Sequence, residues 1–476
     1  MSGTEIADPT QLGATQIVEA MRDGKLSSRA LMEAVLDRID RLTPGINAIV
    51  SLRPRAELLA EARDRDNRAL AGPLHGLPVA IKDLVATKGL RTTFGSPVFA
   101  DNIPEADDLV AARLKAAGAI VIGKTNTPEW GHGSHTFNPV FGPTRNPYDP
   151  ACSAGGSSGG AAAALAARML PLADGSDMMG SLRNPAAFCN VYGFRPSWGL
   201  VPQDSGGDTF LSTLSTEGPM ARSPRDLALL LSVLAGPNPE APFGRPPPDL
   251  SDIGCETLSG KRIGWLADWG GAYPLEPGIR ETCEAALAVF EDLGAIVEPL
   301  DPPFPAEDLW SSWTTLRAGL NAGSKQALAS DPEKRALTKP ESLWEIDQGQ
   351  ALSAAAFYEA SRIRSLWYRE AAQLFERFDA LALPSAQVWP FPVDWRHPTR
   401  IGSREMDTYH RWMEVVVPVS LAGLPCLGLP AGFSDAGLPM GMQLFGPTGS
   451  DAAILAMGDA YHRATDWPPR RPPALS

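Results

Sequence analysis

The sequence predicts an α/β protein with a parallel or mixed β-sheet. Apolar runs with strand character, such as 78–82 and 119–123, are separated by a helical stretch at 109–117. Such alternation of strands and helices favours a sheet with helices packed on it. The chain has 476 residues, of which 44% are hydrophobic, and this is enough for a large buried core.

Two helices are expected before the first strand, at 12–23 and 28–42. Ser27 or Ser28 provides an N-cap for the second helix. Gly24 and Pro44 are expected to mark the ends of these helices. The apolar face of the second helix consists of Leu31, Ala34, Val35, Ile39 and Leu42.

The second half of the chain carries a similar alternation. A helix is expected at 224–235, with Ser223 as its cap and Pro224 in its first turn, followed by a surface loop at 236–260. Residues 305–378 are expected to be largely helical, and their aromatic side chains favour core packing over a binding site. Further strands are expected at 262–267, 296–300, 380–383 and 427–430, and further helices at 279–293 and 452–464.

Composition excludes several classes of function. The formal charge of −13 leaves no basic stripe for nucleic acid or for an anionic membrane surface. No apolar stretch approaches the ~20 residues of a membrane helix, and the N-terminus lacks the features of a signal peptide. The cysteines are odd in number and have no C-x-x-C spacing, so neither a disulfide framework nor a metal site is expected, and no cofactor is expected either. A cytoplasmic location fits best. The cysteines are Cys152, Cys189, Cys255, Cys283 and Cys426.

Chemistry is indicated by two glycine- and serine-rich segments, 155–160 and 175–183, which offer two serines to one site. Lys82 ends an apolar strand upstream and would bring an amine to the same crevice. Two serines and a lysine together suggest acyl transfer. A flexible linker is the simplest alternative for 155–160, but the alanine-rich stretch 161–167 that follows has the helix propensity and small side chains of a buried helix.

The order of the motifs resembles the amidase signature family, from about Thr10 to Thr465. The motifs are Gly-Leu-Pro-Val-Ala-Ile-Lys-Asp at 76–83, Gly-Lys-Thr-Asn-Thr-Pro-Glu at 123–129, Asn-Pro-Tyr-Asp at 146–149, Gly-Gly-Ser-Ser-Gly-Gly at 155–160, the segment from Asp177 to Arg183, Gly-Phe-Arg-Pro-Ser at 193–197, Gly-Pro-Met-Ala-Arg at 218–222, Gly-Leu-Pro at 423–425, and Gly-Leu-Pro-Met-Gly-Met-Gln-Leu at 437–444.

The resemblance implies the amidase signature fold, a large mixed β-sheet core covered by helices on both faces. It implies one domain over 1–476. The signature core would lie at about 70–235, and a variable helical region at about 305–378 would help to wall the substrate funnel. A small-molecule amide substrate is implied, without nucleic acid or membrane, and a homodimer is left open.

The resemblance also assigns catalytic roles. Ser181 would be the nucleophile, Ser157 the serine that relays its proton, and Lys82 the base. The peptide bond between Gly156 and Ser157 would be cis. Lysine can act as a base only when neutral, so desolvation must lower its pKa. Ser158 and Ser176 would orient the lysine, and we interpret Asp177 and Arg183 as structural anchors. The oxyanion hole would consist of the N–H groups of Met178, Met179, Gly180 and Ser181.

One position departs from the family pattern. Met179 stands where most relatives have the first of two glycines, so its side chain is expected to narrow the space beside the acyl carbonyl. Trp130, Gly131 and His132 are expected to line the substrate cleft with Met179. A cleft lined in this way, with a further apolar wall from residues 305–378, favours an uncharged aryl or alkyl amide as substrate.

Three alternatives stay open. The glutaminase subunit of a tRNA-dependent amidotransferase has the same motifs, although it usually keeps both glycines. A degraded, non-catalytic relative is disfavoured because the expected catalytic side chains are present. An α/β-hydrolase-type esterase would explain the Gly-x-Ser-x-Gly patterns, with His397, His410 or His462 as the base, but leaves Lys82 unexplained.

Overall fold

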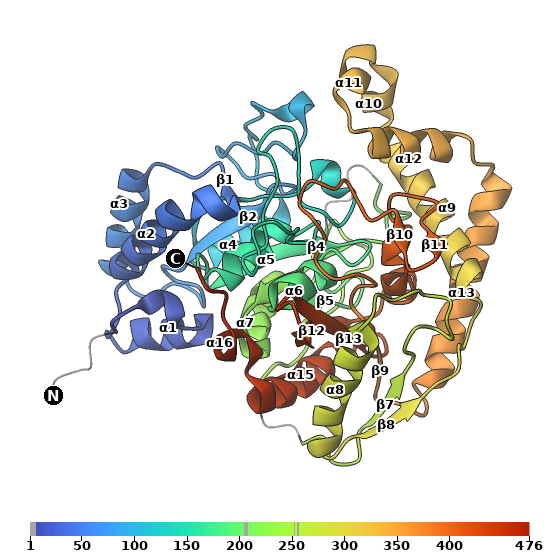
Figure 1. The fold of residues 1–476 in the computed structure, drawn as a ribbon. Coiled ribbons are helices and arrows are strands. Elements are labelled where there is room, and N and C mark those ends of the chain that lie inside the picture. The colour runs from blue at the N-terminus through green and yellow to red at the C-terminus, as the bar shows by residue number, and fades with distance from the viewer. Residues whose placement is uncertain (1–5, 204–207, 252, 255–256, 476) are drawn as a thin grey trace.

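The fold is that of a computed structural model that describes residues 6–203, 208–251, 253–254 and 257–475 (Figure 1). Its main sheet has eight strands. Adjacent strands are antiparallel over most of the sheet, while the last two pairs are parallel, so the sheet is mixed as expected. In spatial order the strands are β4 (Leu172–Asp177), β6 (Thr216–Ala221), β5 (Tyr192–Arg195), β12 (Cys426–Phe433), β13 (Pro439–Phe445), β9 (Ala380–Pro384), β7 (Arg262–Trp265) and β8 (Ile296–Pro299).

The first two predicted strands belong to a separate sheet. β2 (Pro78–Lys82) pairs in parallel with β3 (Ile120–Thr125), which pairs antiparallel with β1 (Ile49–Val50). The Asp174 carboxylate on β4 accepts hydrogen bonds from the Lys82 backbone N–H at 3.1 and 3.2 Å. Lys82 therefore lies at a junction between two sheets. A short hairpin of β10 (Arg400–Ile401) and β11 (Arg404–Glu405) lies elsewhere.

Helices cover both faces of the main sheet. Successive residues of a strand point to opposite faces, and Leu427 and Gly428 on β12 illustrate this. The Leu427 side chain packs on Gly458 of α15 (Asp451–Thr465), whereas the opposite side of the strand at Gly428 packs on Arg183 of α6 (Arg183–Cys189). The helices α7 (Pro224–Leu234) and α8 (Ile279–Asp292) lie near α15. Strand β13 is not among the strands that the sequence predicts.

The N-terminal helices are α1 (Ala14–Arg22), α2 (Ser28–Ile46), α3 (Arg55–Asp66) and α4 (Leu109–Ala116). Ser27 caps α2 by accepting from the Ala30 N–H, as predicted. The prediction that α2 ends at Pro44 was wrong, because Pro44 lies inside its last turn. The helix continues past the proline to Ile46, whose side chain is buried. Asn47 then ends the helix in the left-handed conformation.

The region 305–378 is helical, as predicted, and forms one flank of the molecule (Figure 1). Trp310, Trp313 and Trp367 are buried there, which confirms the core interpretation for these three. Tyr358 is 73% exposed. The helices are α9 (Ala306–Ser324), α10 (Gln326–Ser330), α11 (Pro332–Leu337), α12 (Pro340–Gln350) and α13 (Ala354–Leu374); α14 (Val417–Ala422) and α16 (Trp467–Arg470) come later. Short 3-10 turns lie at Pro9–Gln11, Pro97–Phe99, Glu129–Gly131 and Arg411–Val416.

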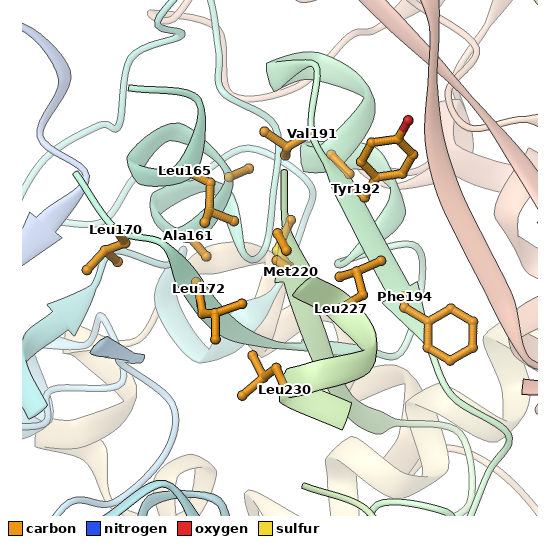
Figure 2. Packing of buried hydrophobic residues seen from close by; sticks show 14 of the residues in the cluster. Ala161, Leu165, Leu170, Leu172, Val191, Tyr192, Phe194, Met220, Leu227 and Leu230 are labelled. Atoms are coloured by element: carbon orange, nitrogen blue, oxygen red, sulfur yellow. The ribbon is translucent and has the colours of Figure 1, made fainter. Parts of the chain in front are cut away.

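The alanine-rich helix α5 (Gly159–Ala166) is buried over its whole length. Figure 2 shows Ala161 and Leu165 of this helix in the same hydrophobic cluster as Leu172 of β4 and Leu227 of α7. The helix begins against other backbone, since a Cβ at Gly160 would lie 2.3 Å from the Asn126 backbone nitrogen. The glycines of 155–160 thus permit close packing, which a flexible linker would not need.

Ser223 caps α7 and Pro224 opens its first turn, both as predicted. Cys152, Cys189, Cys283 and Cys426 are free thiols in the structure. Cys255 lies outside the described residues, as do parts of the predicted loop 236–260. Of the helices that the structure describes, none combines the length and the apolar character needed to cross a membrane.

Candidate active site

The Lys82 amine lies at the centre of the candidate site and is fully buried. Its Nζ atom lies 2.8 Å from Ser157 Oγ, 2.8 Å from Ser158 Oγ and 2.9 Å from Ser176 Oγ. β2 delivers the lysine, the turn before α5 delivers Ser157 and Ser158, and β4 delivers Ser176. The peptide bond between Gly156 and Ser157 is cis. Three separate segments therefore meet at one amine.

Burial lowers the pKa of Lys82 below that of a free lysine, because the interior disfavours the charged form. The carboxyl groups of Glu217, Asp174 and Asp177 act in the opposite direction. The two effects leave a lysine that is easier to deprotonate than one in water. A neutral amine is what a proton acceptor requires.

The three hydroxyl partners suit both protonation states. A charged ammonium donates three hydrogen bonds, and each serine oxygen can accept one. A neutral amine donates only two and carries a lone pair, so one of the hydroxyls can turn and donate its proton to the nitrogen. The arrangement therefore lets a serine pass a proton to Lys82 without moving heavy atoms.

Ser181 lies on the turn between β4 and α6 and is 8% exposed. Its backbone carbonyl accepts a hydrogen bond from the Ser158 N–H at 3.2 Å, which ties the two serine segments together. Within the described residues no hydrogen bond joins the hydroxyls of Ser157 and Ser181. The structure thus brings Lys82 and Ser157 into contact and places Ser181 on the adjoining segment.

The Ser181 turn is fixed by a buried ion cluster around Asp177. Arg183 donates to the Asp177 carboxylate through Nε at 2.9 Å and Nη2 at 2.8 Å, and Arg195 Nη1 lies 3.2 Å from it. Burial alone would raise the pKa of Asp177, but Arg183 and Arg195 hold it well below the usual range. The two arginines therefore favour the ionised form of Asp177, and its contacts are those of an anchor.

One of the four N–H groups assigned to the oxyanion hole is already engaged. The Gly180 N–H donates to Asp177 Oδ1 at 2.8 Å. Gly180 has a φ of +77° and a Cβ there would lie 2.0 Å from Asn184 Oδ1, so the turn requires glycine at this position. The N–H groups of Met178, Met179 and Ser181 are the candidates left for an oxyanion.

The two methionines of the turn lie in different surroundings. Met179 is 3% exposed and belongs to a hydrophobic cluster of the core. Met178 lines a cavity of about 720 Å³, and its sulfur lies 3.4 Å from Arg317 Nη1. Arg317 in turn forms an ion pair with Glu345 at 2.7 Å. The side chain that faces this cavity is therefore Met178, the neighbour of the predicted Met179.

Of the segment 130–132, Gly131 lies beside Ser157. A Cβ at Gly131 would lie 3.5 Å from Ser157 Oγ. His132 is buried and contacts Ser342 Oγ at 2.8 Å and Asn321 Oδ1 at 3.3 Å. Burial lowers the pKa of His132 far below its usual value, so the ring is neutral. Trp130 stacks on Phe94, with ring centroids 5.4 Å apart.

The cavity beside Met178 is lined by β6, by the chain before it, by α9 and by the segment between α12 and α13. Its apolar wall includes Leu320, Leu352 and Phe357, but the wall also carries Glu217 and Lys325. Of the aromatic residues expected to form an apolar wall, only Phe357 lines this cavity; Trp310, Trp313 and Trp367 are in the core.

Glu217, Arg317 and Lys325 are not among the residues that the sequence predicts for the site. Glu217 could have been noticed as a charged residue just before the Gly-Pro-Met-Ala-Arg motif, within an otherwise uncharged strand. Arg317 and Lys325 lie in a helical region that carries many charges, and nothing in their spacing distinguishes them.

Comparison with known proteins identifies the family of the chain. A family model described as amidase matches residues 30–455. A glutamyl-tRNA(Gln) amidotransferase subunit from Thermus thermophilus is 38% identical, over 95% of this chain and 97% of its own. An acylamidase of Rhodococcus erythropolis is 33% identical over 97% of both chains.

Solved structures give the same result. A bacterial aryl acylamidase of the amidase signature enzymes has a TM-score of 0.91 and 30% identity, covering 98% of this chain and 99% of its own. A glutamyl-tRNA(Gln) amidotransferase subunit from Thermotoga maritima has a TM-score of 0.78 and 29% identity, covering 97% and 96%. With the family model and these relatives spanning nearly the whole chain, the protein belongs to the amidase signature family of enzymes that act on carbon–nitrogen bonds.

Proposed function

We propose that the protein hydrolyses a carboxylic acid amide through an acyl-enzyme, with Ser181 as nucleophile, Ser157 as proton relay and Lys82 as base. The observation that carries the proposal is the fully buried Lys82 amine at 2.8 Å from Ser157 Oγ. Serine is too weak an acid to attack an amide unaided, and this contact supplies a proton acceptor.

In the first half of the reaction, neutral Lys82 takes the Ser157 proton while Ser157 takes the Ser181 proton. Ser181 Oγ bonds to the amide carbon, and the oxyanion is held by N–H groups of the 178–181 turn. Collapse of this tetrahedral intermediate breaks the C–N bond, and the proton returns from Lys82 through Ser157 to the leaving nitrogen. Ammonia or an amine leaves, and Ser181 carries the acyl group as an ester.

In the second half, water attacks the ester carbon. The same relay takes a proton from the water and returns one to Ser181 Oγ, which releases a carboxylic acid. Each group that gave a proton in the first half receives one back. No metal or cofactor is needed for this sequence.

A glutaminase subunit of a tRNA-dependent amidotransferase is the second candidate. Its support is the 38% identity to the Thermus thermophilus protein. The free amidase is favoured by the higher TM-score to the aryl acylamidase, 0.91 against 0.78 for the Thermotoga maritima protein. Met179 in place of a glycine also favours it.

The α/β-hydrolase alternative has little support. In the described residues no histidine is hydrogen-bonded to Ser157 or Ser158. His397 contacts the Pro398 carbonyl, His410 contacts Thr408, and His462 contacts Tyr192.

The deciding experiment is a panel of amides tested with the purified chain alone, scored for ammonia or amine release. We expect hydrolysis without partner proteins, and at least a ~10³-fold loss in Ser181→Ala. A fluorophosphonate should label Ser181 stoichiometrically. Activity that appears only with partner proteins would favour the hypothesis of an amidotransferase subunit. Labelling of a different serine would exclude Ser181 as the nucleophile.

A further inference from the structure

Glu217 is a carboxyl group beside the Lys82 site that the proposed mechanism does not use. It lies on β6 directly opposite Ser176 of β4 in the strand register. Directly opposed residues of antiparallel strands project to the same face of the sheet with neighbouring Cβ atoms. Because Ser176 Oγ is 2.9 Å from Lys82 Nζ, the register places the Glu217 side chain next to the lysine.

The surroundings of Glu217 do not stabilise a lone carboxylate. The residue is half-buried in the wall of the cavity, but its Oε2 atom is buried and has no hydrogen-bond partner among the described residues, and the Gln203 amide lies 3.4 Å from Oε1. A buried carboxylate without donors is costly unless a cation lies near or a proton is bound. In the part of the chain that the structure describes, Glu217 and Lys82 do not form a direct ion pair within 4.0 Å, but Glu217 lies opposite Ser176 in the register and Ser176 contacts the lysine.

We propose that Glu217 is the counter-ion of Lys82 and sets the pH range in which Lys82 can act as a base. The inference rests on the proposed function and adds a positioning residue to it. In the resting site the pair holds one proton in common, either as ammonium and carboxylate or as amine and carboxylic acid. Loss of that proton leaves neutral Lys82 beside ionised Glu217.

Other charges around the pair have different partners. Asp174 on β4 accepts from the Lys82 backbone, and Asp177 is paired with Arg183 and Arg195. Lys124 on β3 donates to Thr87 and to the Val85 carbonyl. Asp108, at the N-terminal end of α4, adds negative charge near Glu217. Glu217 differs from Asp174 and Asp177 because, among the described residues, its Oε2 has neither an arginine nor a backbone N–H as a partner.

The test is the pH dependence of kcat/KM in Glu217→Gln. An opposite charge near a lysine favours the ammonium, so its removal should move the midpoint of the acid limb to lower pH by about one unit or more. Glu217→Asp keeps the charge and should restore most of the wild-type midpoint. Asp208→Asn is the matched control, because Asp208 lines the same cavity but its carboxylate is held by the N–H groups of Phe210 and Leu211. An unchanged midpoint in folded Glu217→Gln would overturn the proposal.

A second measurement does not depend on activity. In urea denaturation at pH 7, Glu217→Gln should lower the midpoint in the wild-type background but leave it unchanged or raise it in the Lys82→Met background, where Glu217 has lost its partner. Equal effects in both backgrounds would refute the coupling. If no amide is hydrolysed, the proposed function fails while this cycle still decides whether the two side chains are paired.

Discussion

Lys82 and Lys124 lie on adjacent parallel strands of the same small sheet, one at the end of β2 and the other near the end of β3. Both are fully buried, and burial lowers the pKa of both, that of Lys124 to about 8. They differ in what their amines contact. Lys82 contacts three serine hydroxyls, whereas Lys124 contacts the Val85 carbonyl and Thr87 Oγ1.

Because burial lowers the pKa of both lysines, the proposal that Lys82 is the base rests on these contacts. A backbone carbonyl can only accept, so Val85 has no proton to give to Lys124, and the Thr87 hydroxyl already donates its proton to the same carbonyl at 3.2 Å. Asp83 adds a negative charge that favours the ammonium of Lys124. A serine hydroxyl can accept from an ammonium or donate to an amine, and this allows Lys82 to change its protonation state in place.

Lys82→Met should have the largest effect. We expect at least a ~10³-fold loss of kcat/KM with the fold retained, because the residues of one proton relay act as a unit. Adding Ser181→Ala to Lys82→Met should cost little more. Kinetics and circular dichroism of the two single variants and the double variant measure this. A Lys82→Met protein that kept most of its activity would remove lysine from the mechanism.

The pH profile of the wild-type enzyme should give the next largest effect. Lys82 must be neutral to accept a proton, so kcat/KM should rise about tenfold per pH unit below the midpoint and level off above it. Since burial lowers the pKa of Lys82, the midpoint should lie below that of a free lysine, ~10.4. A profile that is flat from acid to alkaline pH would contradict a lysine base.

Lys124→Met is the matched control for Lys82→Met. It should keep kcat/KM within about tenfold of wild type, because Lys124 does not contact the serines. The variant removes the Lys124 donor from the buried Val85 carbonyl, which keeps only the Thr87 hydroxyl at 3.2 Å, and a loss of about 1–3 kcal/mol in the free energy of unfolding is expected. Urea denaturation and initial rates measure the two effects separately. If Lys124→Met were as inactive as Lys82→Met but as stable as wild type, the contrast between the lysines would be lost.

The sequence predicted the elements around the site better than their arrangement. Local signals were sufficient for the cap at Ser27 and for the buried helix after Ser158, because cap chemistry and alanine content act over a few residues. Pro44 misled, since the helix continues past it to Ile46, whose side chain is buried, and local sequence does not reveal that packing. Glu217 could not be assigned, because its proximity to Lys82 depends on which strands pair, and β6 pairs with β4 across 39 or more positions of chain.

The two methionines of the 178–181 turn allow a smaller comparison of the same kind. Met178 lines the cavity and Met179 is packed in the core. Met178→Ala should therefore change the relative kcat/KM values across a panel of acyl groups by about tenfold, as differences of one or a few methylene groups usually do. Met179→Ala should mainly lower the free energy of unfolding, by about 2–5 kcal/mol for a buried methionine.

The measurement for this pair is a specificity profile together with a urea melt for each variant, so that loss of folded protein is not mistaken for a change in preference. Equal shifts of the specificity profiles of the two variants would mean that the turn as a whole, and not one methionine, influences the choice of substrate. A shift in Met179→Ala alone would restore the original expectation that Met179 narrows the acyl site. A shift in Met178→Ala alone would assign that role to Met178, whose sulfur is held 3.4 Å from Arg317. The variable helical region would then influence substrate choice through the Arg317 contact as well as through its own cavity wall.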